Sequence, residues 1–586
     1  MGVWKYSAVG VIICALIPGL TPGARLQGQQ AAEHTTPAKV DVYVAPFSHL
    51  DLFWAGTREE DLARGNRVIA KAIQIADEHP GFRFFIESNN FLANYVESHK
   101  SSQQLADLKR LVKEGRIEIA ANWANIFLNM PGGEVLARNI LYGKLYAQDV
   151  FGVSPRVMSP TDIPGFTSQY PQLLREAGLP FMLMSRMGPR DKSLFNWSSP
   201  DGSKVEVWNE IYGYCWGAQA DSPDILNSPK KENLFNQIER VHATAPGSIF
   251  MSSGCDLWAP TRKLISNLET LNQDRPSVHF TVGTPQDFFN AVGKAPDLPD
   301  LSGEIPMGWP HVVDGILHLW QQTVPATNTL ITAEEFSAIN SALGYAEYPH
   351  QEFGTLWKRL IESMDHNHDG QGGQIGDNRK LEYEHLAIIR GGEILRDMLR
   401  NIAERVENPI AKSFPIVVFN GLGWQRDDFV KAHATIYGDV IPARIEEYKR
   451  GLRLVDEKGK PVPFYVEQTS DNISRAVDLI FVAHHIPSLG YKTYYLKSAD
   501  PPDSFPATSR VLLDRDKDLK DPRRPLGVDS MENDFYRVEV DKATGEVSVF
   551  DKQLNREVAR DMRIAAQKSA GRTTSRRNWT PAARFR

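Results

Sequence analysis

The chain has 586 residues, of which 42% are apolar and 24% are charged, and this composition excludes a single small module and a disordered or collagen-like chain. Its 66 basic and 72 acidic residues give a net charge of −6, which provides no general electrostatic reason to bind nucleic acid.

The N-terminus carries the pattern of a secretory signal. Lys5 precedes an apolar run over residues 9–20, and small residues follow it up to Ala24. The run is shorter than the ~20 residues that span a bilayer and contains Pro18, so a retained membrane anchor is the less favoured reading. We therefore expect a signal peptide over residues 1–24, cleaved near Ala24, then a linker over residues 25–39. The predicted location is periplasmic or extracellular, without stable membrane insertion.

The chain contains three cysteines. Cys14 lies in the predicted signal, which leaves Cys215 and Cys255 in the mature protein. Two thiols in a chain of this length do not make a disulfide framework. Whether these two pair is left open by the sequence.

Short apolar segments alternate with amphipathic ones over residues 40–305. The segments with strand character are 40–45, 82–86, 117–120, 181–184, 205–208, 249–251 and 278–282. Repeated strand-helix units predict a parallel sheet, open or closed into a barrel, with functional residues where strands end. We predict a multidomain α/β protein whose residues 40–305 form a (β/α) barrel-like domain.

The pattern changes towards the C-terminus. Residues 306–408 contain long helical patterns and predict a helical bundle. Strand-like runs separated by turn pairs such as Asn420-Gly421 return over residues 409–563, which predicts a β-rich domain in the form of an incomplete β-sandwich. Residues 564–586 form a basic tail without an acidic residue, and we hypothesise a truncated or frame-shifted reading frame there.

His49 and Asp51 follow the first predicted strand and lie two residues apart. In an extended backbone their side chains project to the same side and can converge on one cation. An imidazole together with a carboxylate suits zinc. A hydrogen-bonded surface pair is the commoner explanation of an isolated His-x-Asp pattern.

Three further segments carry candidate residues, each with an ordinary structural explanation. Asp162 lies between a short strand and a helix, where Asp is often a turn former or a helix cap. Asp256 follows the predicted strand 249–251 and has the same alternative. His368 and Asp369 follow a helix of the predicted bundle, where a histidine often complements the helix dipole.

Together and in this order, the four segments resemble glycoside hydrolase family 38, the retaining zinc-dependent α-mannosidases. His49 to Trp54 resembles the family's His-x-Asp-x-x-Trp zinc motif, and residues 162–178 resemble its nucleophile segment with the helix that follows. Gly254-Cys255-Asp256 is similar to the acid/base segment and His368-Asp369 to the late His-Asp pair. The resemblance runs from about residue 40 to residue 563.

The resemblance implies an enzyme that cleaves terminal α-mannosides with retention through a covalent glycosyl-aspartate. Asp162 would be the nucleophile, and Asp256 would act first as the acid and then as the base. The implied ligands of one Zn²⁺ are His49, Asp51, Asp162 and His368. The implied substrate contacts are Trp54, Arg186, Tyr214 and Asp369.

The sequence departs from the family pattern beside the nucleophile. Asp162-Ile163-Pro164-Gly165 stands where family members usually carry Asp-Pro-Phe-Gly, so we expect a different wall at that point and a divergent specificity. Two other functions stay open. One is a metal-dependent polysaccharide deacetylase, which also uses His and Asp on a related barrel, and the other is a non-catalytic sugar-binding protein or inactive fragment.

Overall fold

The computed structural model describes residues 39–245, 247–293, 298–309, 317–368, 373–435, 452–467, 476–498, 509–510, 530–541 and 543–562. The predicted signal peptide, the basic tail and Asp369 lie outside the described residues. Among the helices of these ranges, none combines the length and the apolar character needed to cross a membrane.

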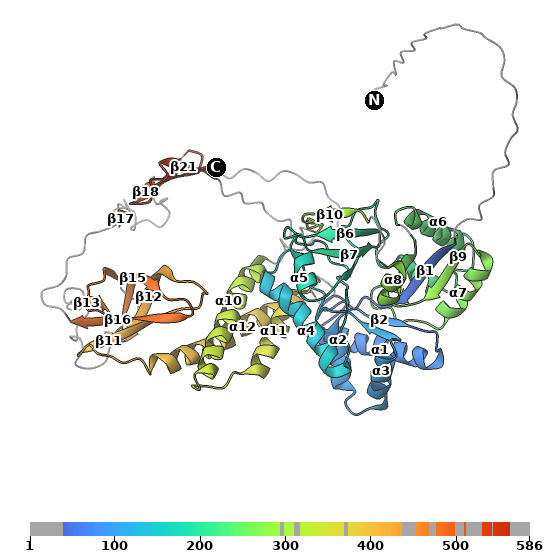
Figure 1. Ribbon diagram of the computed structural model, residues 1–586, viewed down its shortest axis with the longest axis horizontal. Coiled ribbons are helices and arrows are strands. Elements are labelled where there is room, and N and C mark those ends of the chain that lie inside the picture. The colour runs from blue at the N-terminus through green and yellow to red at the C-terminus, as the bar shows by residue number, and fades with distance from the viewer. Residues whose placement is uncertain are drawn as a thin grey trace, which may run out of the picture. The chain divides into compact units, whose positions relative to one another are not determined.

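The first part of the chain alternates strands with helices (Figure 1). Its strands are β1 Val40–Pro46, β2 Phe84–Ile86, β3 Ile117–Ile119, β4 Val157–Met158, β5 Phe181–Met184, β6 Leu194–Ser198, β7 Lys204–Asn209, β8 Ile249–Ser253, β9 Val278–Val282 and β10 Asp300–Ser302. Its helices are α1 Arg58–Glu78, α2 Asn89–Ser98, α3 Gln103–Lys113, α4 Gly133–Phe151, α5 Tyr170–Glu176, the 3₁₀ helix η1 Trp216–Asp221, α6 Lys230–His242, α7 Lys263–Asp274 and α8 Pro285–Val292.

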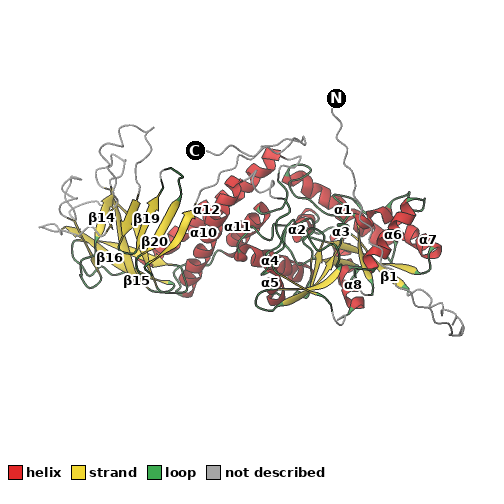
Figure 2. Cartoon of the chain, turned by 90° about the horizontal axis from the view of Figure 1, so that it is seen from above, coloured by secondary structure: helices red, strands yellow, loops and turns green. Residues whose placement is uncertain are grey.

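These strands form three hydrogen-bonded sheets in which most neighbours are parallel. β1 lies between β8 and β9, β2 pairs with β3, and the largest sheet has the order β10-β6-β7-β5-β4. Figure 2 shows red helices among these yellow strands. The predicted mixture of α and β structure is confirmed, whereas closure of the strands into a barrel stays a prediction.

β1 positions the first candidate segment. Both of its edges are hydrogen-bonded, and Val42 and Val44 are completely buried, as in parallel strands covered on both faces. The loop after β1 carries His49 and Asp51. α1 then begins with a capping box in which the Thr57 side chain accepts from the Glu60 N–H and the Glu60 side chain accepts from the Thr57 N–H. The loop is therefore fixed at both of its ends.

Three helices follow, namely α10 Leu317–Ala342, α11 His350–Ser363 and α12 Gly373–Ala403, and they pack against one another. Trp357 and Leu360 of α11 lie in the same buried cluster as Leu330 of α10 and as Met158 and Phe166 of the α/β part. The end of α11, and with it the segment 364–368, is thus packed onto the α/β part.

The next part is β-structured. Its strands are β11 Ser413–Asn420, β12 Arg426–Thr435, β13 Leu452–Asp456, β14 Phe464–Glu467, β15 Ala476–Ile486 and β16 Gly490–Ser498. They form two antiparallel sheets, β11-β16-β13 and β12-β15-β14, which share a core that includes Leu454, Leu496 and Phe481.

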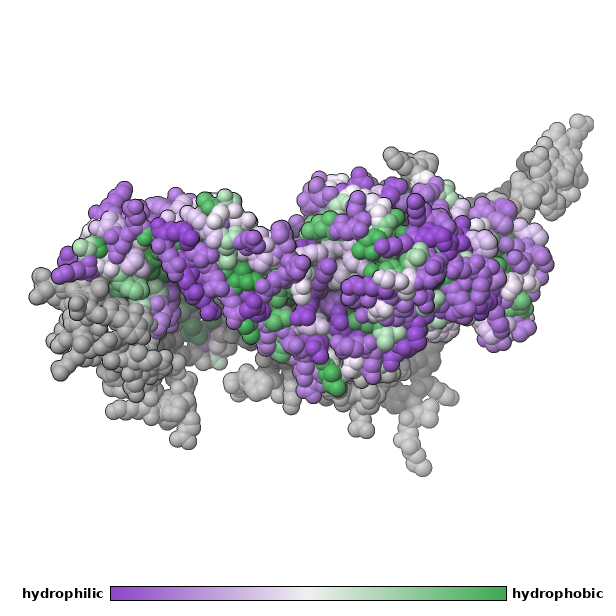
Figure 3. All heavy atoms as spheres, turned by 90° about the horizontal axis from the view of Figure 1, so that it is seen from below, coloured by the Kyte–Doolittle hydropathy of each residue, from purple (hydrophilic) through white to green (hydrophobic). Residues whose placement is uncertain are grey.

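A further antiparallel sheet contains the last described strands, which are β17 Ser509–Arg510, β18 Ser530–Asn533, β19 Tyr536–Val540, β20 Val547–Asp551 and β21 Arg556–Met562. On the face shown in Figure 3, the surface of the described residues is mostly hydrophilic, with separate small hydrophobic patches.

Candidate active site

One cavity of about 460 Å³ brings together residues from widely separated segments. They follow β1, β4, β5, β7 and β8, the strand ends at which the sequence predicts functional residues, and they are joined by the segment after α11. The lining residues are Asp51, Trp54, Asp162, Arg186, Tyr214, Asp256, Trp309, His366, Asn367 and His368. Two of the predicted residues are not among them, because His49 is completely buried next to Asp51 and Asp369 is outside the described residues.

His49 is completely buried, and its two ring nitrogens have different partners. Nδ1 lies 2.9 Å from Glu87 Oε1, which also accepts from the Leu50 N–H at 2.8 Å. Because the carboxylate accepts, Nδ1 carries a proton, and in the neutral ring Nε2 presents a lone pair. That lone pair lies on the side of Asp51, whose Oδ1 is 3.1 Å from Nε2.

His366 has the same arrangement. Its Nδ1 lies 3.1 Å from the Asn125 carbonyl oxygen, which can only accept, so in the neutral ring Nε2 again presents a lone pair. This Nε2 lies 3.3 Å from Nε2 of His49, 3.6 Å from Asp51 Oδ1 and 3.9 Å from Asp162 Oδ2. Two imidazole lone pairs that face each other among carboxylates need a positive charge between them.

The donor set fits a metal ion. Ligand atoms of His49, Asp162 and His366 lie within 4.8 Å of one another, and so do those of His49, Asp51 and Asp256. Neutral imidazole nitrogens together with carboxylates are a zinc donor set. The outer hydrogen bonds are also those of a metal site, since both histidines have a partner on Nδ1 and Asn367 Nδ2 donates to Asp51 Oδ1 at 2.9 Å.

The electrostatics of the group point the same way. Burial by itself lowers the pKa of His49, but the carboxylates of Asp51 and Glu87 outweigh it and raise that pKa well above its ordinary value. Burial also lowers the pKa of His366, and Asp365 and Asp51 reverse the effect. The pKa of Asp51 is lowered because His49 and His366 outweigh its burial. The group therefore attracts positive charge, either a proton or a metal ion.

The zinc-ligand role that the resemblance implies for His368 stays a prediction, and the structure offers His366 as a second candidate. His368 belongs to none of the three groups of candidate ligands among the described residues, and its ring stacks on Phe127 with the centroids 5.5 Å apart. Its buried Nε2 has no hydrogen-bond partner among the described residues. The orientation of His368 has its reason in α12. Lys380, which is completely buried there, donates to the Asp365 carbonyl at 2.8 Å and to the Asn367 carbonyl. Lys380 Nζ is also 3.4 Å from His368 Nδ1, so His366, and not His368, faces His49.

Asp162 lies on the other side of the metal group. Its φ of 58° is unusual for a residue other than glycine, although Asp tolerates this region better than most. Its Oδ1 accepts from Arg186 Nε, while Oδ2 faces His366. The Arg186 guanidinium in turn lies over the rings of Tyr214, at 5.1 Å, and Trp309, at 5.6 Å.

Positive φ values recur around the cavity. Phe53, Met187 and Leu257 have φ values of 67°, 60° and 60°, and each directly follows or precedes a residue that lines the cavity. Such backbone conformations cost energy and cluster at functional sites.

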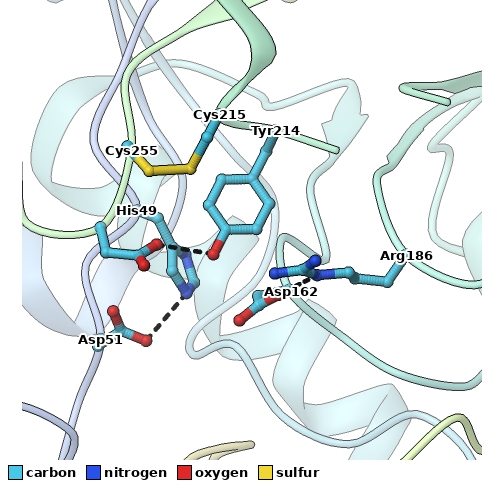
Figure 4. The surroundings of a disulfide bond; sticks show 8 residues. His49, Asp51, Asp162, Arg186, Tyr214, Cys215 and Cys255 are labelled. Carbon is cyan, nitrogen blue, oxygen red and sulfur yellow. Dashed lines mark hydrogen bonds and ion pairs between the residues drawn. A yellow bond between two sulfur atoms is a disulfide. The ribbon is translucent and has the colours of Figure 1, made fainter. Parts of the chain in front are cut away.

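Asp256 is paired with a tyrosine. Tyr214 Oη donates to Asp256 Oδ1 at 2.7 Å, and the tyrosine is buried whereas Asp256 is exposed. Burial, followed by the carboxylates of Asp162 and Asp256, raises the pKa of Tyr214, so its hydroxyl keeps its proton and remains a donor. Cys215 and Cys255, which adjoin this pair, form a disulfide with the Cα atoms 4.7 Å apart (Figure 4). The pairing that the sequence left open is therefore present.

Sequence reasoning missed several residues of the site. Glu87 follows β2 directly, so the rule that selected Asp51, a carboxylate at the end of a strand, also applies to it. Trp309 stands between a glycine and a proline in a loop, which is a weaker signal. Asn125 acts through its backbone carbonyl, which no residue type reveals.

Comparisons with known proteins relate the chain to one family of glycoside hydrolases. Residues 39–307 match the family model described as "Glycosyl hydrolases family 38 N-terminal domain". The chain is 21% identical over 417 residues to the "Alpha-mannosidase" of Saccharomyces cerevisiae, over 68% of this chain and 37% of that protein. It is 24% identical over 270 residues to "Alpha-mannosidase G" of Dictyostelium discoideum, over 44% of this chain and 24% of that protein.

Solved structures show the same fold. An alpha-mannosidase from Enterococcus faecalis V583 superposes with a TM-score of 0.67 at 19% identity, over 89% of this chain and 61% of that chain. The chain thus spans about a quarter to three fifths of the length of these three relatives.

Proposed function

Residues 39–307 belong to glycoside hydrolase family 38, and from this premise we propose that the protein is a metal-assisted α-mannosidase. In this proposal it hydrolyses terminal α-mannosides with retention of the anomeric configuration. One observation carries the proposal: Asp162 and Asp256 line the same cavity, beside a histidine-aspartate group that fits a metal ion. The names of the relatives support the same activity.

Asp162 is the proposed nucleophile. Asp162 lines the cavity and Arg186 holds its Oδ1, so the carboxylate is fixed where it would attack the anomeric carbon. The attack forms the bond between the carboxylate oxygen and the sugar while the bond to the leaving oxygen breaks. The positive φ of Asp162 fits a side chain that the surrounding structure holds in one orientation.

Asp256 is the proposed acid and base. Because Tyr214 donates to Oδ1, the proton for the departing oxygen belongs on Oδ2. In the second half of the reaction the same carboxylate accepts a proton from the water that attacks the glycosyl-aspartate. Asp256 is exposed to solvent in the free protein, and a bound sugar would cover it.

We propose Zn²⁺ as the ion. The proposed ligands are His49, Asp51, Asp162 and His366. When bound, zinc supplies a Lewis-acid contact for sugar hydroxyls in this cavity. Trp54, which is 43% exposed, and Trp309 offer aromatic faces for packing against the sugar ring.

Export remains part of the proposal. The predicted signal peptide supports it, and so does the disulfide, because such bonds persist in oxidising compartments outside the cytosol. The proposed partner is an α-mannoside or a related glycan.

The test is hydrolysis of an aryl α-mannoside by the full chain, with the aryl α-glucoside and the aryl β-mannoside as specificity controls. We expect release of the aryl alcohol, loss of activity on treatment with a chelator and its return with zinc. Asp162→Ala should not hydrolyse the aryl α-mannoside. For the wild-type protein, proton NMR should show the α-anomer of mannose as the first product. Acetate release from an acetylated polysaccharide without aryl mannoside hydrolysis would replace the proposal by a deacetylase, and mannose binding without turnover would replace it by a sugar-binding protein.

A further inference from the structure

The Cys215–Cys255 disulfide occupies a particular place in the cavity wall. Cys215 directly follows Tyr214, and Cys255 directly precedes Asp256, so the bond joins the two chain segments that carry the hydrogen-bonded pair. Figure 4 shows the disulfide next to Tyr214, whose ring lies 5.0 Å from that of His49 between the centroids. These segments are 40 residues apart in the sequence.

The same two segments are fastened independently at a deeper level. The buried carboxylate of Glu210 accepts from the Ser252 N–H at 3.1 Å, from Ser252 Oγ at 2.6 Å and from Trp216 Nε1 at 2.8 Å. Gly217 lies so close to β8 that a Cβ atom there would be 2.2 Å from the Ser252 carbonyl oxygen. The close packing of η1 on β8 therefore has its own interactions and does not depend on the disulfide.

Nearer the cavity, fewer interactions hold the segment that carries Asp256. Asp256 is exposed, and its neighbouring backbone is held to the β1 loop by two hydrogen bonds, from the His49 N–H to the Cys255 carbonyl at 3.3 Å and from the Leu257 N–H to the His49 carbonyl at 2.8 Å. Leu257, the next residue, has a φ of 60°, so the extended backbone ends there. The side chain of Asp256 has one hydrogen bond to the described residues, the one from Tyr214.

An exposed carboxylate with one such partner can exchange that partner for water. A tether between the adjoining residues opposes this exchange, because it limits how far the two segments can separate. The placement of a proton donor matters at the scale of about 1 Å, where misplacement costs a catalyst ~100-fold.

We infer that the Cys215–Cys255 disulfide is a positioning element for Asp256. It keeps the Tyr214 hydroxyl on Oδ1, so that Oδ2 carries the proton towards the departing oxygen. This inference rests on the proposed function, since it presupposes that Asp256 protonates a glycosidic oxygen. It assigns the disulfide to the part of the site that contains Tyr214 and Asp256, the acid half, and not to the part that contains His49, Asp51 and His366, the metal half.

The test uses the dependence of the rate on the leaving group, because a good leaving group departs without a proton and a poor one needs the acid. The substrates are 2,4-dinitrophenyl and 4-methoxyphenyl α-mannoside, and the variant is Cys215→Ser/Cys255→Ser. We expect kcat/KM for the methoxyphenyl substrate to fall at least ~10-fold, part of the ~100-fold or more that a general acid supplies, and kcat/KM for the dinitrophenyl substrate to change less than ~3-fold. Asp256→Ala and Tyr214→Phe should show the same selectivity.

Glu210→Gln is the matched control. It weakens the deep fastening between the same two segments and leaves the disulfide in place, so any loss of activity should be equal for the two substrates. A second measurement does not depend on the folding of the cysteine variant. The folded wild-type protein is reduced with a phosphine and then re-oxidised, and its metal content is measured at each stage. The selectivity for the good leaving group should appear on reduction and disappear on re-oxidation.

Three results would overturn the inference. Equal losses for the two substrates would make the disulfide merely structural. Unchanged kinetics would remove any role in positioning. A second metal ion bound on reduction would show that the thiols and Asp256 form a metal site instead. If the wild-type protein releases neither aryl alcohol, the proposed function itself fails, an outcome distinct from the other three.

Discussion

Replacement of each of the two histidines near the end of α11 gives a sharp test of the metal site. His366 and His368 lie two residues apart and line the same cavity. Nε2 of His366 lies within 4 Å of His49, Asp51 and Asp162, whereas no such contact of His368 is found among the described residues. We therefore expect His366→Ala to lose zinc and His368→Ala to keep it.

The magnitude follows from the role of each ring. Changing a group that only orients a ligand weakens metal binding 10–100-fold, so loss of the ligand His366 should weaken it at least ~100-fold, or about 2.7 kcal/mol. In His368→Ala, Lys380 can still donate to the carbonyls of Asp365 and Asn367, so the loop that carries His366 keeps these two hydrogen bonds. Zinc affinity should then change less than ~3-fold.

The assay is independent of activity. Each variant is purified, dialysed against a chelating dye of known zinc affinity and analysed for bound metal, and circular dichroism checks that it is folded. If His368→Ala lost its zinc while His366→Ala retained it, the ligand assignment would be reversed and the family resemblance would have been the better guide.

Three further outcomes are expected. Glu87→Ala removes the acceptor from His49 Nδ1 and should weaken zinc binding 10–100-fold, measured by the same dialysis. Trp309→Ala should raise KM for an aryl α-mannoside ~2–10-fold with little change in kcat, as expected for loss of an aromatic face worth ~0.5–1.5 kcal/mol; a loss confined to kcat would contradict this role. Burial raises the pKa of Glu210 from its usual 4.5 to about 7, against the hydrogen bonds from Ser252. Between these two pH values the folded state binds the extra proton, so stability should fall as the pH rises from 4.5 to 7, by ~1.4 kcal/mol per unit of pKa shift, and urea titrations of Glu210→Gln should lack this slope.

The sequence predicted the location of the site better than its details. Parallel strands end at one edge of a sheet, so residues after β1 and β8, which are neighbours in one sheet, are expected to meet, and Asp51 and Asp256 both line the cavity. Asp162 follows β4 of another sheet and lines the same cavity, which the rule for a single sheet does not predict. The mixture of α and β structure followed from the alternation of apolar segments. Closure of a barrel does not follow from that alternation, because closure depends on register and tilt, which are set by contacts between distant strands.

Two details could not be read from the sequence for definite physical reasons. Which of His366 and His368 faces the metal group depends on a lysine of the next helix and on the backbone carbonyl of Asn125, and both reach the segment only in the folded chain. The pairing of Cys215 with Cys255 depends on the close approach of η1 to β8. This approach is possible because Gly217 has no side chain.

The two halves of the site are held by different means, and this difference can be measured. The metal-binding residues depend on buried hydrogen bonds to His49 and His366, whereas Asp256 depends on a partly buried hydrogen bond beside a disulfide. A chelator should therefore lower the rates with good and poor leaving groups by the same factor, because it acts on sugar binding and on the nucleophile's surroundings. A reductant should lower only the rate with the poor leaving group. If the two halves act independently, the two treatments applied together should multiply their effects, and a combined loss much smaller than the product would show that the disulfide and the metal group support one another.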